Sequence, residues 1–138
     1  MTPVFVDTSA LLAFLDADDE SHPEAVSHWH RLLDGIAAGE FQGVTHYGVV
    51  VETSALVQRR LGMDALERLH GVLLGALAVE WVDEVLHGRA TAAMLGARHR
   101  RVSLVDWTSF ELIRTSAIHY ALAFDSDFDD RGFRLPWE

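Results

Sequence analysis

Apolar and polar positions alternate along the chain in blocks that predict strands and helices in turn. Val4–Val6 is a short apolar run with two β-branched residues, which is typical of a strand buried on both faces of a parallel sheet. Asp7 closes this run, and Thr8 and Ser9, which favour helix starts, lead into an apolar helical segment at 10–15. The pattern places the Asp7 carboxylate at the carboxyl end of a first strand, where open α/β sheets bind ligands, although a simple helix cap would explain the same residue.

The same alternation continues to the end of the chain. Apolar periodicity predicts further helices at about residues 22–38, 47–61, 64–77, 83–98 and 107–115. The helix at 83–98 is expected to face the core with Val85, Leu86, Ala90, Ala93, Met94 and Ala97. Further strands are predicted at 43–46, 78–82 and 120–124, with a short edge strand at 133–135. Because strands that alternate with helices imply right-handed crossovers, we expect one α/β domain, residues 1–138, built as a three-layer α/β/α sandwich around a mostly parallel sheet of four to five strands.

Glu52 occupies an unusual position in this pattern. It follows three valines in the predicted helix 47–61, in a segment that is apolar on nearly every side. Burying an unpaired carboxylate there would cost several kcal/mol or raise its pKa until it protonates. Arg59 and Arg60 lie two helical turns further on, so an ion pair within the helix is possible but not natural. A cation supplied from elsewhere explains the position better.

Asp106 and Asp125 each follow an apolar segment, as Asp7 does. Asp106 comes directly after Val102–Val105, and Asp125 directly after the strand predicted at 120–124. Because the carboxyl ends of parallel strands meet at one edge of the sheet, acids from strand ends and from helices entered at that edge should converge on one cleft. The converging set is Asp7, Glu52, Asp106 and Asp125.

Such a set of acids favours a cation site. Clustered carboxylates cannot all be ionised without compensation, so the site either protonates or binds cations. Oxygen ligands, without cysteine and without histidine at ligand spacing, select hard ions such as Mg²⁺ or Mn²⁺. An ion held there would suit phosphodiester hydrolysis, because it polarises the phosphoryl oxygens, lowers the pKa of a water molecule and stabilises the leaving oxygen.

Composition narrows the class of protein further. The chain has no cysteine, no apolar run near the roughly 18 residues of a membrane span, and no basic segment at its start like that of a signal peptide, so we expect a cytoplasmic protein without membrane contact. Its formal net charge of −10 argues against a general basic surface for nucleic acids. All 11 basic residues are arginine, which excludes Schiff-base lysine chemistry and the phosphate-binding lysine of P-loops. Arg98, Arg100 and Arg101 either complete a helix C-terminus or form a rim that contacts phosphates.

Four short motifs occur in a specific order: Val-Asp-Thr-Ser-Ala-Leu-Leu at 6–12, the helical Glu52 preceded by valines, Ser-Leu-Val-Asp-Trp-Thr-Ser-Phe at 103–110, and Ala-Phe-Asp-Ser-Asp-Phe at 123–128. Together they resemble the PIN domain, most closely the VapC-type toxins of bacterial type II toxin–antitoxin pairs, over essentially the whole chain. The resemblance implies a Mg²⁺-dependent endoribonuclease that acts on RNA, forms a homodimer and is blocked by a cognate antitoxin.

The resemblance also implies roles for individual residues. Asp7 and Asp106 would be direct metal ligands, Glu52 and Asp125 would complete the set, and Asp127 would be a variable fifth acid. Thr8 or Ser9 would donate a hydrogen bond near the metal.

Other protein classes fit the chain less well. A phosphotransfer receiver domain relies on a lysine near its acidic pocket, and this chain has none. A phosphatase of the haloacid-dehalogenase type would need a second aspartate two residues after Asp7, where Ser9 stands. A non-catalytic PIN-like module for dimerisation or scaffolding remains the alternative to the enzyme.

Overall fold

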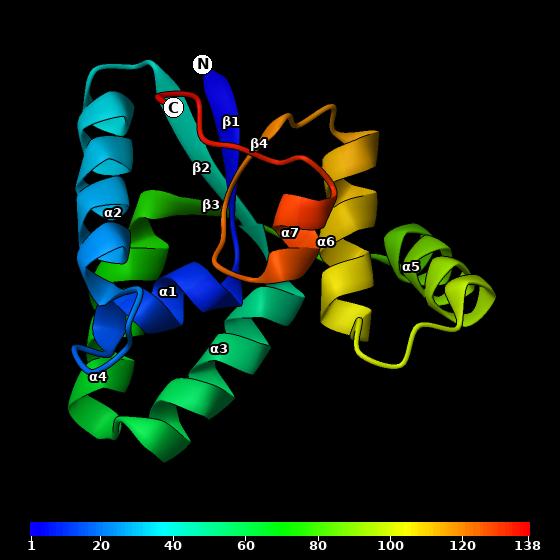
Figure 1. The fold of residues 1–138 in the computed structure, drawn as a ribbon, viewed down its shortest axis with the longest axis horizontal. Coiled ribbons are helices and arrows are strands. Elements are labelled where there is room, and N and C mark those ends of the chain that lie inside the picture. The colour runs from blue at the N-terminus through cyan, green and yellow to red at the C-terminus, as the bar shows by residue number, and fades with distance from the viewer.

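The computed structural model describes residues 1–138 and centres on a sheet of four strands (Figure 1). The strands are β1 (Thr2–Val6), β2 (Phe41–His46), β3 (Leu77–Glu80) and β4 (Tyr120–Leu122), and every neighbouring pair is parallel. β1 lies inside the sheet, where Val4, Phe5 and Val6 are completely buried. The first apolar run therefore forms the expected strand, because a parallel strand covered on both faces needs apolar side chains on both.

Helices cover both faces of this sheet. Figure 1 shows α2 (His22–Ala37) on one side of the strands and α6 (Leu104–Thr115) with α7 (Ser126–Asp130) on the other. The remaining α-helices are α1 (Thr8–Leu15), α3 (Tyr47–Arg60), α4 (Met63–Arg68) and α5 (Glu84–Ala97). This is the three-layer α/β/α arrangement that the sequence predicts. None of the helices has the length and hydrophobicity required to cross a bilayer.

The strand order β3-β2-β1-β4 creates a crevice at one edge of the sheet. From β1 the chain moves outward through β2 to β3, and then returns to the opposite side of β1 to form β4. Ligands of open α/β sheets bind where the strand order reverses in this way, beyond the carboxyl ends of the strands. Here the backbone N–H of Asp7 donates to the carbonyl of Leu122 at 3.0 Å, so the segments that follow β1 and β4 begin side by side.

The helix predicted at 64–77 is interrupted. After α4 the chain forms one π-helical turn, Leu69–Leu73, and one 3₁₀ turn, Leu74–Ala76, before β3 begins. Gly71 and Gly75 lie in these turns, and glycine weakens a regular helix because it gains the most backbone freedom on unfolding. The apolar periodicity of this segment predicts five inward leucines, of which Leu66 is half-buried and the other four are buried: Leu69, Leu73, Leu74 and Leu77.

Other boundaries differ near the strand ends. β2 begins two residues earlier than predicted, β3 ends two residues earlier, and β4 ends at Leu122. The edge strand predicted at 133–135 is reduced to a single parallel bridge between Tyr120 and Arg134, since Pro136 follows at once and lacks a backbone donor. The sequence predicts a loop at Asp129 and Asp130, but these residues end the short helix α7 instead.

Two helices are more exposed than their sequences suggest. In α3, Val51 is 52% exposed and Glu52 is only half-buried, so the expectation of a helix apolar and buried on nearly every side is wrong. In α5, Ala90 is the only buried residue, and Val85, expected to face the core, is 62% exposed. α5 packs mainly on α6 and projects from the body of the molecule (Figure 1). Apolar periodicity identifies a face that needs cover but does not say which surface covers it.

Candidate metal centre

Three aspartates stand at the starts of three helices around the crevice. Asp7 is the N-cap of α1, Asp125 is the N-cap of α7, and Asp106 forms a capping box with Ser103 in the first turn of α6. Aspartate is favoured at these positions because its carboxylate accepts hydrogen bonds from free backbone N–H groups and suits the helix dipole. The residues that begin the helices are therefore also the residues that bring negative charge to the crevice.

Each of these carboxylates uses one oxygen for the cap. Asp7 Oδ2 accepts from the backbone N–H of Ser9 at 3.1 Å and from its hydroxyl at 2.7 Å. Asp106 Oδ2 accepts from the N–H and the hydroxyl of Ser103 at 3.2 and 3.1 Å, and Asp125 Oδ1 accepts from the N–H of Asp127 at 2.9 Å. The second oxygens of Asp7 and Asp106 form no hydrogen bond within the chain, and the side chain of Asp125 lies close enough to that of Asp127 to share a hydrogen bond when Asp127 is protonated. The caps thus orient the carboxylates and leave one oxygen of each for a ligand.

Asp106, Asp125 and Asp127 come closest to a metal-binding geometry. One carboxylate oxygen from each lies within 4.8 Å of the others, and all three residues are half-buried. No arginine neutralises them, because the two ion pairs of the chain, His28–Glu138 and Arg114–Glu111, lie elsewhere. A set of carboxylate oxygens without nitrogen or sulfur ligands suits a hard divalent cation.

Asp7 is the most buried acid of the site, with 3% of its surface exposed. Burial raises its pKa to about 6, against the lowering effect of the two hydrogen bonds from Ser9, and the charges of Asp106 and Asp125 raise it further. Burial, followed by the charges of Asp125 and Glu52, also raises the pKa of Asp106. The acids at the starts of α1, α6 and α7, with Glu52 on α3, therefore repel one another, and a cation would relieve this repulsion.

Asp127 shares this environment. Burial and the neighbouring charge of Asp125 raise its pKa, while His99 lowers it. The structure thus brings Asp127 into the same cluster as Asp106 and Asp125, whereas Asp7 lies close by but outside the trio of oxygens.

The two hydroxyls predicted to lie near the metal have different surroundings. Ser9 lies beside Asp7, and its Oγ accepts the backbone N–H of Phe124 at 2.8 Å, so it joins the start of α1 to the segment after β4. Thr8 instead accepts a hydrogen bond from Thr53 at 3.0 Å, and both side chains are buried. The only hydrogen bond of the Thr8 hydroxyl therefore joins α1 to α3, the helix that carries Glu52.

The predicted basic rim remains free of partners within the chain. Arg98, Arg100 and Arg101 are all exposed, and none of them forms an ion pair. Arg98 ends α5 in a left-handed conformation, with φ of 53°, and the following residues connect α5 to the start of α6. Because Asp106 lies in the first turn of α6, the segment that carries these arginines leads directly into the helix that carries one acid of the cluster.

Two supporting features were not predicted from the sequence. The Ser103–Asp106 capping box has a recognisable local signature, Ser-x-x-Asp, which could have been found. The contact between His46 and Ser109 has none, because the two residues lie far apart in the sequence and meet only in the fold.

His46 links the two helices that carry Glu52 and Asp106. Its Nδ1 accepts the backbone N–H of Gly48 at 3.0 Å and so caps α3, which leaves Nε2 to donate to the Ser109 hydroxyl on α6 at 2.8 Å. The ring is completely buried, and burial lowers the pKa of His46 to about 4, so it stays neutral at neutral pH. A neutral imidazole in this position holds α3 and α6 together without adding a charge.

Comparisons with known proteins agree with this architecture. A family profile for the PIN domain matches residues 4–134. The chain is 34% identical over 131 residues to the 23S rRNA-specific endonuclease VapC20 of Mycobacterium tuberculosis, in both the CDC 1551 / Oshkosh and the H37Rv strains, and the match covers 94% of this chain and 95% of the relative. It is also similar to the crystal structure of M. tuberculosis VapC20, described as a toxin that cleaves the sarcin–ricin loop. There the TM-score is 0.79 and the sequence identity 32%, over 94% of this chain and 95% of that one.

Proposed function

The chain belongs to the PIN domain family, and we propose that it is a divalent-metal-dependent endoribonuclease, the toxin of a VapBC-type toxin–antitoxin pair. The observation that carries the proposal is the cluster of aspartate oxygens at the point where the strand order reverses. Asp106, Asp125 and Asp127 offer oxygens within 4.8 Å of one another, and no arginine of the chain pairs with them. A non-catalytic module would gain nothing from acids placed in this way, whose pKa values are raised first by burial and then by the charges of their neighbours.

The acids have separate proposed roles. Asp7 and Asp106 are direct ligands of Mg²⁺, with Mn²⁺ as a substitute, and Glu52 and Asp125 complete the set. Asp127 is a fifth ligand, which its place beside Asp106 and Asp125 supports. A bound divalent ion would neutralise the clustered charge, polarise the phosphoryl group and lower the pKa of the attacking water.

Other features of the chain orient the proposed metal ligands. The helix caps fix one oxygen of each of Asp7, Asp106 and Asp125, so little reorganisation of these carboxylates would accompany metal binding. Ser9 orients Asp7 through its hydroxyl.

The substrate is RNA. The exposed Arg98, Arg100 and Arg101 would contact its phosphates beside the acidic cluster and offset the repulsion between the substrate and a chain with a net charge of −10. Because the relatives that match the chain are named for cleavage of 23S rRNA, this RNA and its sarcin–ricin loop are the first substrates to test. The proposed site of action is the cytoplasm, where ribosomes are found.

We further propose that two copies of the chain form a homodimer through α3 and α5. Tyr47, Val51, Trp81 and Val85 are all strongly exposed, and the rings of Tyr47 and Trp81 lie 4.9 Å apart. This apolar patch joins the start of α3 to the start of α5, the helix with a single buried residue. A second copy of the chain that covers this patch would bury the apolar side chains of α5 that the fold of one chain leaves exposed. A cognate antitoxin is the second partner, and a basic side chain that enters the acidic crevice would block it.

A cleavage assay with a matched pair of variants tests the enzyme. Purified protein is incubated with 23S rRNA in Mg²⁺ or Mn²⁺, and the cut sites are mapped by primer extension. Asp125→Asn keeps the cap of α7 but removes one charge from the cluster, and we expect a loss of at least about 100-fold, or roughly 3 kcal/mol of transition-state stabilisation. Asp129→Asn removes the same charge from an exposed position of the same helix and should keep full activity.

Three results would contradict this function. Cleavage that continues in EDTA would rule out the proposed metal centre. An equal loss of cleavage in Asp125→Asn and Asp129→Asn would rule it out as well. A folded wild-type chain that cleaves neither 23S rRNA nor total RNA would favour the scaffold alternative.

A further inference from the structure

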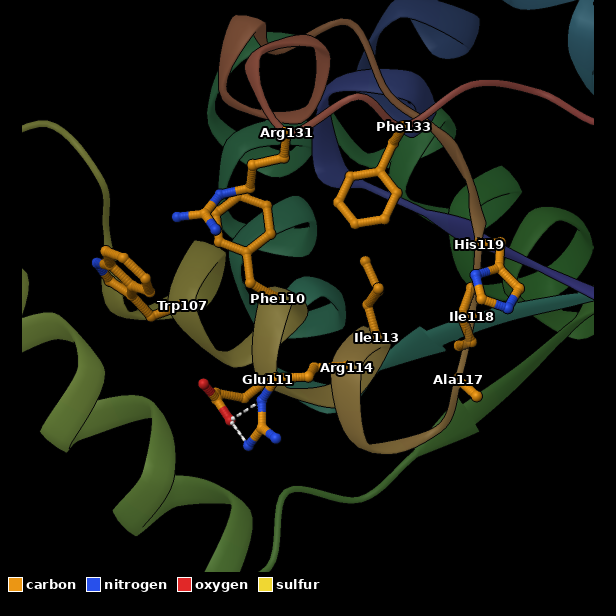
Figure 2. Close-up of a pocket in the computed structure, with 10 residues that line it drawn as sticks. All are labelled: Trp107, Phe110, Glu111, Ile113, Arg114, Ala117, Ile118, His119, Arg131 and Phe133. Atoms are coloured by element: carbon orange, nitrogen blue, oxygen red, sulfur yellow. Dashed lines mark hydrogen bonds and ion pairs between the residues drawn. The ribbon is translucent and has the colours of Figure 1, made fainter.

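Two hollows beside the acidic cluster share a wall formed by Trp107 and Arg131. The larger has a volume of about 500 Å³ and runs along α6 toward His119. The smaller, about 260 Å³, is lined by Asp127 and His99 and so opens beside the acidic cluster. Trp107 and Arg131 therefore line both the larger hollow and the smaller one that Asp127 lines. Figure 2 shows these two residues beside the other residues that line the larger hollow.

Arg131 is held against aromatic rings rather than carboxylates. The centre of its guanidinium lies 3.9 Å from the centroid of the Phe110 ring and 5.0 Å from that of Trp107 (Figure 2). The residue is exposed and forms no ion pair, although Asp127 and Asp130 line the same smaller hollow. A guanidinium stacked on a ring keeps its N–H edges free, and those edges match the oxygens of a phosphate.

The larger hollow is lined mostly by apolar residues: Phe110 and Ile113 are buried in its wall, and Phe133 is half-buried. Its volume lies within the range of small-molecule pockets. Figure 2 shows Phe133 and Ile113 facing Phe110 across it, with His119 at the far rim. Proteins bind unpaired RNA bases by stacking them on aromatic rings and guanidinium planes. Because stacking accepts any base, such a site would position a base without selecting its identity.

We propose that Arg131 binds a phosphate of the RNA substrate next to the one that is cleaved, and that the hollow beside α6 takes the adjoining unpaired base. This inference rests on the proposed endoribonuclease function and adds a substrate site to it. RNA is favoured over a peptide because the hollow combines aromatic faces with an unpaired cation beside the acidic cluster.

The test uses the full chain and a synthetic hairpin RNA of the sarcin–ricin loop sequence, with Mg²⁺. Arg131→Gln removes the charge and the stacked plane, and Arg134→Gln is the matched control, since Arg134 is exposed in the same segment but lines neither hollow. We expect Arg131→Gln to raise KM about tenfold with kcat within about twofold of wild type, because the lost contact lies away from the reacting phosphate. For Arg131→Gln, the slope of log KM against log salt concentration should fall by about 0.7, which corresponds to one lost phosphate contact. Arg134→Gln should change neither KM nor this slope.

The base is tested separately from the phosphate. Single abasic substitutions are placed along the loop, and wild type should lose affinity at one position beside the cut site. Phe133→Leu, which keeps the apolar volume but removes the ring, should raise KM on intact RNA and abolish the penalty for the abasic position. Thermal unfolding of each variant identifies any general loss of structure, and a folded Arg131→Gln with the expected KM and salt effects supports the site even if Phe133→Leu unfolds.

Four outcomes would overturn all or part of the inference. Equal KM values and salt slopes for Arg131→Gln, Arg134→Gln and wild type would remove the phosphate contact. An Arg131→Gln variant that cleaves RNA normally but escapes an inhibitory antitoxin would assign the hollow to the protein partner. If the wild-type chain cleaves total RNA but no abasic position depends on Phe133, the base site alone is ruled out. If the wild-type chain neither cleaves nor binds RNA, the endoribonuclease function is ruled out as well.

Discussion

Asp7→Asn should make the metal-free protein more stable while it destroys the enzyme. The carboxylate of Asp7 is 3% exposed and its pKa is raised to about 6, mainly by burial, so its charge opposes folding at neutral pH. Asparagine also caps helices well and can still accept the two hydrogen bonds from Ser9. The substitution therefore removes the charge and keeps the local structure.

The pKa shift sets the size of the effect. A rise from 3.8 to about 6 corresponds to about 3 kcal/mol of unfavourable free energy once the group is fully ionised. With a typical unfolding entropy for 138 residues, that free energy is equivalent to a rise in Tm of about 10 °C. The gain should be complete well above pH 6 and should disappear below about pH 4, where Asp7 is protonated in both the folded and the unfolded state.

Because His46 also affects stability in this pH range, the quantity to measure is the difference in stability between wild type and Asp7→Asn. Its pKa is lowered from 6.5 to about 4, so the unfolded chain binds an extra proton between these values and stability falls as the pH falls through this range. Asp7 acts in the opposite direction over nearly the same range, because its folded state binds the extra proton. The wild-type curve should therefore vary little with pH here, whereas Asp7→Asn should lose stability steadily on acidification.

The assay is thermal unfolding in EDTA from about pH 4 to pH 8, with Asp18→Asn as a control for loss of an exposed charge. Addition of Mg²⁺ should then raise the Tm of wild type more than that of Asp7→Asn, because the ion binds the folded state and Asp7 is a proposed ligand. The reasoning is refuted if Asp7→Asn lowers the Tm in EDTA at pH 8, or if its gain does not depend on pH.

Two further predictions concern residues outside the acidic cluster. His46→Ala should cost about 2–4 kcal/mol in urea unfolding, because it leaves a cavity and removes the hydrogen bonds to Gly48 and Ser109, although the Ser109 hydroxyl keeps its bond to the Val105 carbonyl. A cost below about 1 kcal/mol would contradict the role of His46 as a link between α3 and α6. Val51→Asp should convert the proposed homodimer to a monomer in sedimentation experiments, whereas Val72→Asp, at a site that is 65% exposed on another segment, should not; equal behaviour of the two variants would place the interface elsewhere.

Local signals in the sequence account for most of the secondary structure near the site. Asp7 and Asp125 were predicted at the ends of strands, and each is also a helix cap, because the same short polar side chain that stops a strand can satisfy free N–H groups. The boundaries failed where local signals were weak. The glycines at 71 and 75 interrupt a helix whose leucines keep their apolar period, and α7 is a helix of five residues that depends on one cap.

Burial was the less predictable property. The valines around Glu52 and the apolar positions of α5 look the same in the sequence as those of core helices, yet Val51 and Val85 are exposed. Apolar periodicity indicates that one face of a helix is buried in the functional protein. A second protein chain can bury that face as well as the core of the same chain can.

The sequence alone determined the fold class, the alternation of strands and helices, and the set of acids at their junctions, since these depend on neighbouring residues and on the two side-chain periods. Only the tertiary structure decided which acids share one space and what surrounds them. The strand order brings α1, α6 and α7 to one crevice, groups Asp127 with Asp106 and Asp125, and turns Thr8 toward Thr53. It also aligns His46 with Ser109 and Arg131 with Phe110. Such contacts join distant parts of the chain, so their geometry follows from the packing of the whole sheet and its helices rather than from any local pattern.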